Sequence, residues 1–535
     1  MGEEKEKVFL REATGLVREA STLDILALAS INMSWGLSAM WYFLWGPYLA
    51  PGGNLTIGIL ITLIPMIFGA LVWAFMAIIM PRSGGDYIFN SRTIHPLAGF
   101  LSSFGWVVVN FIWCGVLTAY IIDPALTTLF AMMGWEKAAE VISSFWGILL
   151  LGTLFIVFET IVHILGLRAY LIVQLITFAF GVLMFILVWA LLIPVSREGF
   201  IAAWNSFSAQ YGGGTYDEII SAAKSYMQSE YGLTIQPSWR ATVSLMPIAF
   251  WGLGYPYFAA FIAGETKRVH RAALIGIPMG LILCGISWLI TGWLLEAKAG
   301  YEFLVCVIYA AVDGLPVYGN IPFEPLFFAL PTILTKNAVI IFLIGFGYFC
   351  WNLLYPILSL MGQTRIALAW SFDRLAPEFF GDVSEKYHTP VKSTIFFAIG
   401  GWIVLLLYAI KPAMFASFTA MIPQILTTFL FTAIAAIIIP YRKKTKELYN
   451  ASPASKYKIG NIPLVTLSGI IYLGLLLTVV YFYFTNPGLG AWHLPSFLVI
   501  LGIYIFAIIY FFAMREYRKK QGIDIDLAFK ELPPE

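Results

Sequence analysis

Charged residues are scarce in this sequence of 535 residues. Asp, Glu, Lys and Arg together make up 12% of the chain, about half their share in ordinary soluble domains, whereas 60% of the residues are hydrophobic. A chain with so little charge cannot cover its apolar surface in water, so a soluble globular protein is excluded. The net charge is +2, and because no basic patch carries interleaved aromatic residues, we expect no nucleic-acid partner.

Cysteine is also rare. The four cysteines are scattered singly, and their spacing matches neither a metal site nor a disulfide framework. The apolar segments lack H-E-x-x-H, G-x-S-x-G, paired intramembrane aspartates and any Cys/His cluster. We therefore expect no enzyme activity, no catalytic residue, no metal and no cofactor.

Long hydrophobic runs, by contrast, are abundant. A window of about 20 residues, the length at which an α-helix crosses the hydrocarbon core, finds about twelve candidate spans. The sequence therefore predicts an all-α polytopic membrane protein in a lipid bilayer. Its spans are expected at Leu23–Pro47, Leu55–Met80, Leu97–Phe130, Ile142–His163, Ala169–Pro194, Val243–Gly264, Ala272–Ala297, Asn337–Met361, Val391–Ile410, Ala413–Pro440, Ile462–Thr485 and Leu494–Met514.

The distribution of basic residues predicts the orientation. The N-terminal segment "MGEEKEKVFLREATGLVREAS" lacks the apolar core and cleavage site of a signal peptide, so it is expected to stay on the protein. With the N-terminus inside, 25 of the 32 basic residues fall in inner segments and 7 in outer ones. Since Lys and Arg accumulate on the cytoplasmic side, residues 1–22 and 515–535 are predicted to be cytoplasmic segments of a multi-pass protein of the cell membrane.

Two spans are interrupted at corresponding places. An extracellular loop, residues 196–240, separates two groups of five spans, residues 23–195 and 241–440; residues 441–514 hold a cytoplasmic loop and the last two spans. The first span of the first group contains "SINMSWGLSAMW", and the first span of the second contains "FWGLGYPYF". Matching breaks in two halves indicate an inverted-repeat transporter with its substrate site near the midplane. The alternative is that these Gly and Pro residues only allow packing or a kink.

A broken helix exposes backbone groups that lipid cannot satisfy, so it must be buried in protein or line a cavity. Free N–H groups at a helix start attract a carboxylate, and free carbonyls at a helix end suit an ammonium group or a cation. A site that offers both would bind the two ends of an amino acid.

Three predicted cytoplasmic segments carry motifs of a known family. "MPRSGGDYIFNSRTIHPLAGFLSSFGW" is similar to the P-R-x-G-G-[ED]-Y loop after helix two of the amino acid–polyamine–organocation superfamily. "AGETKRVHRAALIGI" resembles its segment after helix six, with Val269 in place of a proline, and "MGQTRIALAWSFDRLAPEFFGDVSEKYHTPV" its segment after helix eight. The resemblance implies a leucine-transporter-type fold of 5+5 inverted repeats with broken helices one and six, plus two further helices, working by alternating access.

The resemblance also implies where the substrate binds. Backbone amides would hold its carboxylate at the first break, which maps onto Met33, Ser34, Trp35, Gly36 and Leu37. Carbonyls would face its amine at the second break, which maps onto Phe250, Trp251, Gly252, Leu253 and Gly254. Trp251 matches a gating aromatic residue of antiporters in the family. Because glycine permits close approach of backbone to ligand, Gly36→Val is expected to abolish uptake without loss of stability, whereas Gly58→Val is expected to disturb packing.

Four other polar or charged residues within the spans are candidates for a functional or structural role. Asn110 is a candidate substrate contact, since relatives carry a polar contact on this helix; the alternative is an interhelical hydrogen bond. Asp123 precedes a proline near the outer end of its span, where helix capping or a loop contact is expected. Glu159 and His163 close the fourth span, where a salt bridge or an interfacial position at the cytoplasmic end is expected.

The coupling ion stays open between H⁺ and Na⁺. The fifth span lacks the lysine that stands in for sodium in proton-coupled members of the family, and Tyr257 occupies a position where some antiporters carry glutamate. Sodium would need carbonyls of the first break together with hydroxyl or amide oxygens on helix eight, where Asn352 and Ser359 lie.

The leading hypothesis is a secondary transporter for amino acids. Trp35, Trp41, Trp113 and Trp251 could surround a cavity, and aromatic faces favour apolar side chains or cations. Because few acidic residues lie at the midplane, neutral and especially large apolar or aromatic amino acids are favoured over polyamines and other cationic amines; an amino acid exchanger is a further alternative. An ion channel is disfavoured, since channels need a continuous polar lining.

Overall fold

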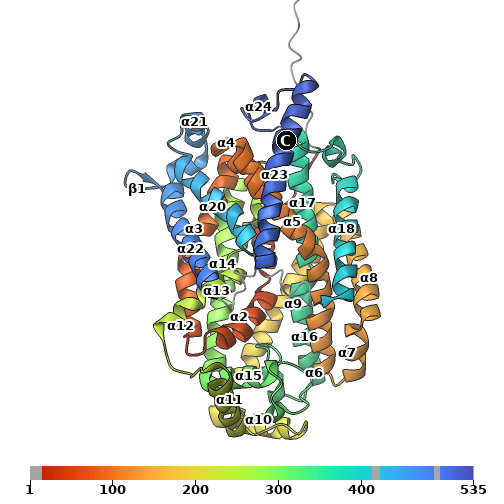
Figure 1. Ribbon diagram of the computed structural model, residues 1–535, viewed down its shortest axis with the longest axis vertical. Coiled ribbons are helices and arrows are strands. Elements are labelled where there is room, and N and C mark those ends of the chain that lie inside the picture. The colour runs from red at the N-terminus through yellow and green to blue at the C-terminus, as the bar shows by residue number, and fades with distance from the viewer. Residues whose placement is uncertain (1–14, 413–421, 487–493, 534–535) are drawn as a thin grey trace, which may run out of the picture.

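The computed structural model describes residues 15–412, 422–486 and 494–533. Within these residues the protein is a bundle of long helices that run between two ends (Figure 1). The uninterrupted helices that coincide with predicted spans are α3 (Leu55–Ile79), α8 (Phe145–Ile164), α9 (Leu167–Leu192), α14 (Val269–Lys298), α18 (Val391–Ile410), α22 (Leu464–Thr485) and α23 (Leu494–Lys520). The third predicted span, Leu97–Phe130, consists of α5 (Pro96–Tyr120), η1 (Ile121–Leu126) and α6 (Thr127–Met132), with non-helical backbone at Asp123.

The prediction of an all-α polytopic membrane protein is confirmed. In the described part of the chain, ten helices are long and apolar enough to cross a membrane, or eleven if α20 (Ile422–Ile438) and α21 (Lys443–Ala451), bent by 80°, form one span. The sixth predicted span, Val243–Gly264, does not count among them because it is not one continuous helix. The tenth, Ala413–Pro440, begins in residues 413–421, which lie outside the described residues.

The first span is two helices, α1 (Thr22–Met33) and α2 (Trp35–Leu49). Ser21 and Asp24 form a capping box that starts α1. The break falls at Ser34, whose φ of 42° lies in the left-handed region that few residues other than glycine adopt. The break predicted in "SINMSWGLSAMW" is therefore present.

The sixth span is broken more severely. α12 (Trp239–Ser244) leads into α13 (Met246–Leu253), which ends at Gly254, and the chain continues in 3₁₀ turns, η2 (Pro256–Phe261) and η3 (Ala263–Glu265). Pro256 has no N–H with which to extend α13, which gives a physical reason for the end. The second predicted break is also present.

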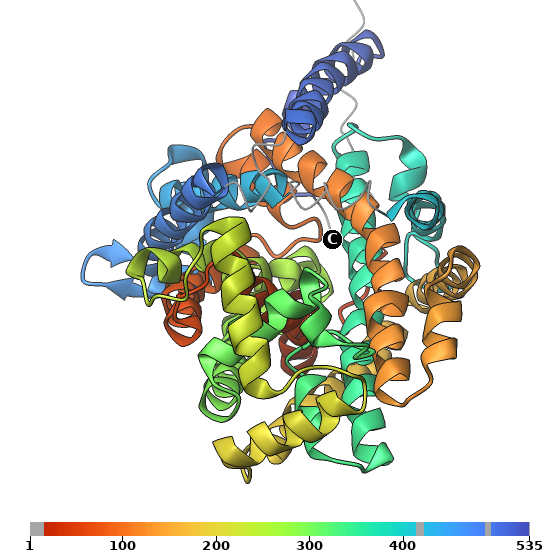
Figure 2. The ribbon, with the colours of Figure 1, turned by 60° about the horizontal axis from the view of Figure 1, so that its bottom comes forward.

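One end of the bundle is covered by helices that the sequence suggests only as a loop. Residues 196–240 fold into α10 (Arg197–Ala209) and α11 (Tyr216–Tyr231) ahead of α12, and α11 packs on α15 (Tyr301–Val312) (Figure 2). Tyr216 stacks on Phe303 of α15 with ring centroids 4.3 Å apart. Hydropathy does not predict α15, because its twelve residues are too few to cross a membrane.

The other end carries α4 (Asp86–Thr93), α21 and α24 (Ile525–Ala528) (Figure 1). The eighth span consists of α16 (Ala338–Leu353) and α17 (Tyr355–Phe372), so it reaches this end eleven residues beyond its predicted limit at Met361. The remaining short elements are α7 (Glu136–Ser143), η4 (Pro316–Tyr318), η5 (Leu330–Leu334), η6 (Glu378–Gly381), η8 (Pro453–Lys456) and the paired strands β1 (Lys458–Ile459) and β2 (Ile462–Pro463).

Burial separates the centre of the bundle from its rim. In the first span, 83% of the most apolar window is buried, whereas the corresponding values are 28% for α8 and 11% for α23. Leu150, Leu154 and Ile161 of α8 are exposed, as expected of side chains that face lipid. The two broken helices therefore lie in the protected centre of the bundle.

Candidate substrate site at the two helix breaks

The first break offers unpaired backbone donors. The hydroxyl of Ser34 donates a 2.8 Å hydrogen bond to the carbonyl of Trp351 in α16, so it does not cap α2. The first N–H groups of an α-helix have no partner within the helix. The N–H groups of Trp35, Gly36 and Leu37 therefore begin α2 without a side-chain cap, as an anion-binding helix start requires.

The second break offers backbone acceptors. α13 ends where the N–H of Gly254 donates to the carbonyl of Phe250 at 2.7 Å. The last carbonyls of a helix lack donors from a following turn. The carbonyls of Trp251, Gly252 and Leu253 lie in that position.

The two breaks are held together by side chains. The amide of Asn32 at the end of α1 donates to the carbonyl of Tyr255, and the indole of Trp288 in α14 donates to the carbonyl of Trp35 at 3.1 Å. A Cβ on Gly252 would lie 2.5 Å from Cβ of Ser38 in α2, so glycine is required for this approach. The two segments that the sequence predicts to meet are therefore in contact.

Half-buried aromatic rings stand beside the breaks. Trp41 of α2 meets Trp251 of α13 edge to face, with centroids 4.8 Å apart, and stacks with Tyr120 at 6.5 Å. The indole nitrogen of Trp41 is buried and has no hydrogen-bond partner among the described residues. Trp113 packs near Tyr255 at 6.1 Å. Three of the four tryptophans predicted to surround a cavity are therefore close to the breaks.

Trp35 starts α2 at the first break, but its ring packs against other helices. Its ring stacks on Trp351 at 5.2 Å and packs edge to face with Phe178 and Phe185 of α9. A Cβ on Gly36 would lie 2.5 Å from this same Trp351 ring. The side chain of Trp35 therefore points into packed protein, and so would any side chain placed at position 36. The backbone N–H groups of both residues nevertheless start α2.

The expectation that Gly36→Val would spare the scaffold is therefore wrong. Added atoms would press on Trp351, just as a Cβ on Gly58 would press on the hydroxyl of Tyr42 at 2.6 Å. Both glycines serve packing, so Gly58 is no control for Gly36.

Asn110 is satisfied within the protein. Its NH₂ group donates to the carbonyl of Trp106 at 2.9 Å, and its oxygen accepts from the hydroxyl of Ser359 in α17 at 3.1 Å. The hydrogen bond from Ser359 joins α17 to α5, so it matches the interhelical role that was the alternative to a substrate contact for Asn110. Met33 has a similar local contact, since its carbonyl accepts from Ser38 Oγ at 2.5 Å.

Two buried ion pairs lie at the end of the bundle that carries α4. Arg365 of α17 donates to both oxygens of Glu265, at 3.0 and 2.7 Å, and both side chains are 1% exposed. Arg92 of α4 donates to both oxygens of Asp373, at 2.6 and 2.8 Å, and Tyr87 donates to the same carboxylate. We call these two pairs the closing ion pairs.

The closing ion pairs join the three segments on which the family resemblance rests. The motifs in these segments do not by themselves predict which charged residues form ion pairs with each other. A signal is nevertheless present in the sequence: Arg365 is the one charged residue of α17, and a charged residue within a membrane helix needs a partner.

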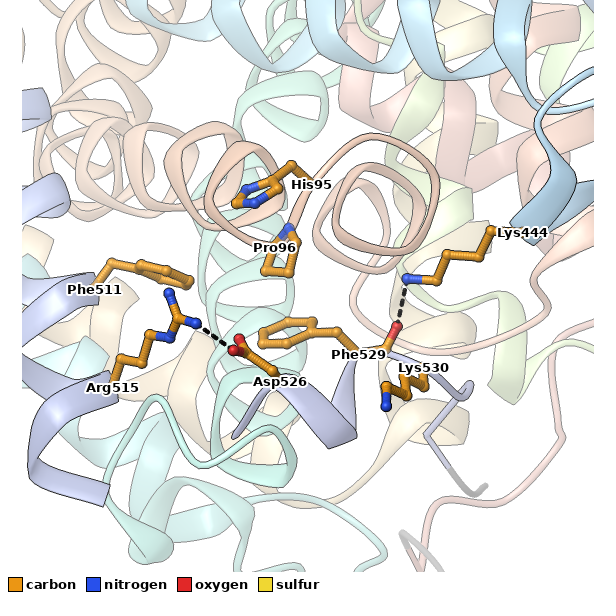
Figure 3. A pocket seen from close by; sticks show the side chains of 8 residues that line it. All are labelled: His95, Pro96, Lys444, Phe511, Arg515, Asp526, Phe529 and Lys530. Atoms are coloured by element: carbon orange, nitrogen blue, oxygen red, sulfur yellow. Dashed lines mark hydrogen bonds and ion pairs between the residues drawn. The ribbon is translucent and has the colours of Figure 1, made fainter. Parts of the chain in front are cut away.

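The C-terminal segment folds back onto the same end. Arg92 also donates to the carbonyls of Ala528 and Glu531, both at 3.3 Å, and Lys444 of α21 donates to the carbonyl of Phe529 at 2.9 Å. Figure 3 shows Phe529 between Lys444 and the ion pair of Arg515 with Asp526, in a cavity of about 560 Å³. Burial and the neighbouring cations Arg92, Arg442 and Lys530 lower the pKa of Lys444.

Asp123 lies in η1 near the opposite end. It is exposed, and it accepts a 2.9 Å hydrogen bond from the hydroxyl of Thr127, a local contact of the predicted kind. It lines an open cleft of about 520 Å³ together with Glu136, Glu140 and Glu324.

Glu159 and His163 do not lie where the sequence suggests. Glu159 is 0% and His163 2% exposed, so neither is interfacial. Glu159 makes no salt bridge within the described residues. His163 Nε2 lies 3.3 Å from Arg365 Nη1, next to a closing ion pair. The expected end-of-helix salt bridge of Glu159 is therefore a wrong prediction.

Comparisons with known proteins agree with the fold. A family model described as "Amino acid permease" matches residues 23–512. Over 181 residues the chain is 30% identical to "Cationic amino acid transporter 4, vacuolar" of Arabidopsis thaliana; this alignment covers 34% of the chain and 26% of the plant protein, about a quarter of that relative's length. The family match includes both helix breaks and the closing ion pairs, and it points to a transporter rather than an enzyme. The chain belongs to the amino acid permease family.

Proposed function

We propose that this protein is a secondary transporter that moves amino acids across the cell membrane by alternating access. The observation that carries the proposal is the approach of two helix breaks in the buried centre of the bundle. The uncapped start of α2 would bind the substrate carboxylate through the N–H groups of Trp35, Gly36 and Leu37. The open end of α13 would face the ammonium group through carbonyls of residues 251–253.

The aromatic rings beside the breaks suggest the substrate class. Trp41, Trp251 and Tyr120 present ring faces and edges, which suit a large apolar or aromatic side chain. Ring faces also attract cations, and the plant relative is named for cationic amino acids. Neutral amino acids are the first candidate, and cationic amino acids or amines are the second.

The closing ion pairs suggest how access alternates. With both pairs formed, the end that carries α4 is shut. Opening it requires α17 to separate from Glu265 and from α4, after which the substrate can leave on that side. From the distribution of basic residues, we assign this side to the cytoplasm.

Counterflow in proteoliposomes tests the transport function. Vesicles loaded with unlabelled amino acid should take up labelled amino acid with saturation, because a carrier exchanges one molecule for another. A thermal-shift screen of amino acids and amines identifies the substrate, since a ligand that binds the folded state raises its stability. Ohmic current without counterflow would instead identify a channel, and stabilisation by polyamines alone would overturn the neutral substrate class.

Trp251→Ala is expected to raise the KM for uptake about tenfold while the protein stays folded, because the substrate loses an aromatic contact. Trp251→Phe should retain most of the affinity. Trp293→Ala is the matched control, since Trp293 of α14 is 62% exposed, as expected of a ring that faces lipid. An unchanged KM in Trp251→Ala would remove this residue from the proposed site.

A further inference from the structure

α8 carries two titratable side chains on its buried face. Glu159 and His163 are four residues apart, so they lie on the same side of the helix. Both belong to the buried stripe of α8, whose opposite side exposes apolar residues to lipid. A membrane-spanning helix thus turns a carboxyl group toward the protein interior.

This carboxyl group is unpartnered. Neither oxygen of Glu159 has a hydrogen-bond partner within the described residues, and the hydroxyl of Tyr170 in α9 is likewise buried without one. Among the described residues, Cys114 of α5 and Tyr170 of α9 lie near Glu159 on the neighbouring helices, and neither supplies a positive charge. α18 also packs on α8, and the side-chain hydrogen bond described between them is neutral, from Trp402 Nε1 to Thr153. An ionised carboxylate is costly in such surroundings, whereas a proton-bound carboxyl group fits them.

The next turn of α8 leads to a closing ion pair. His163 Nε2 lies 3.3 Å from both Thr364 Oγ1 and Arg365 Nη1 of α17. Because a guanidinium can only donate, a hydrogen bond between Arg365 and His163 requires Nε2 of His163 to accept, which the neutral imidazole can do. A second positive charge is unfavourable while Arg365 stands there. When Arg365 leaves Glu265 and α17 moves away, His163 gains the ability to take up a proton.

We propose that Glu159 is the proton-binding site that couples transport to a proton gradient, with His163 linking it to the ion pair of Arg365 with Glu265. This inference rests on the proposed transport function and names its coupling ion. The carboxylate takes one proton from the side to which the site is open and becomes a carboxylic acid; after the conformational change the same proton leaves on the other side. A lone carboxyl group lacks the further oxygen ligands that sodium needs, so the geometry favours H⁺.

Proteoliposomes with an imposed pH gradient test the proposal. For one proton per substrate, each pH unit should drive about tenfold accumulation of the amino acid that the wild type exchanges. Glu159→Gln, which resembles the protonated side chain, should lose this accumulation but keep counterflow within about threefold of the wild type, since exchange needs no net proton movement. Glu140→Gln, an exposed residue of α7, is the matched control and should behave as wild type.

The outcomes separate the two proposals. Absence of counterflow in the wild type would overturn the transport function itself. Counterflow with full proton-driven accumulation in Glu159→Gln, or accumulation that follows a sodium gradient and ignores pH, would overturn only the proton site. Infrared spectroscopy supplies a readout independent of transport: the wild type should show a protonated-carboxyl band at neutral pH that Glu159→Gln lacks. Should Glu159→Gln fail to fold, Glu159→Asp serves instead, with accumulation retained and its pH dependence shifted.

Discussion

Glu265→Gln is expected to lower the free energy of unfolding by about 3–5 kcal/mol, a large share of the stability of a typical folded protein. The reason is the partner that remains: Arg365 is 1% exposed, and without the carboxylate its charge stays buried against neutral groups. The loss should appear as earlier denaturation on heating in detergent and as a smaller monodisperse fraction.

The matched control is the exposed pair of Lys392 with Asp382, whose side chains are 66% and 50% exposed. Asp382→Asn should cost less than about 1 kcal/mol, because water screens and solvates both charges. Equal stability of Glu265→Gln and Asp382→Asn would mean that the buried pair does not hold the closed end together.

Gly252→Ala is expected to reduce uptake about a hundredfold, because a misplacement of about 1 Å at a binding site has effects of that size. The new Cβ would lie 2.4 Å from the Trp288 ring and 2.5 Å from Cβ of Ser38, so α13 would have to move away from both α14 and α2. Overpacking of this kind should also cost about 1–3 kcal/mol of stability. Initial-rate uptake and thermal denaturation of the same preparations measure both effects.

Gly474→Ala in α22 is the matched control. A Cβ there meets nothing within 4 Å, so alanine should leave uptake unchanged and add about 0.5–1 kcal/mol of helix stability. Wild-type uptake in Gly252→Ala would show that the separation of the two breaks is not critical, which contradicts the proposed site.

Sequence pattern alone locates most of the membrane helices and both breaks. Hydrophobic length gives the helices, and the clusters around Gly36 and Pro256 mark where each broken span fails to continue as one helix. What the pattern does not give is the direction of side chains. Trp35 and Trp41 are six residues apart on one apolar helix, and only the packing places Trp35 against α9 and α16 and Trp41 beside Trp251.

Ion pairs between residues far apart in the sequence are equally difficult to predict from it. Glu265 and Arg365 are 100 residues apart, and nothing in the spacing of either motif states that they meet. The position of Glu159 near the end of a hydrophobic run favours a helix-end role. Its burial follows instead from the packing of α5, α9, α17 and α18 against α8, which the order of residues does not reveal. The helices α10, α11 and α15 escape prediction because hydropathy over a membrane-length window is insensitive to helices this short, whether amphipathic or, like α15, apolar.

The contacts of Arg92 also determine when, during biosynthesis, this end of the bundle can form. At about 5–20 residues per second, the ribosome reaches Asp373, 281 residues later, after roughly 15–55 s, and Ala528, 436 residues later, after roughly 20–90 s. The guanidinium lacks its carboxylate partner until Asp373 is made, and it lacks the carbonyl of Ala528 until the end of the longer interval. Closure of this end of the bundle is therefore a late event of maturation, completed only after translation has passed residue 528.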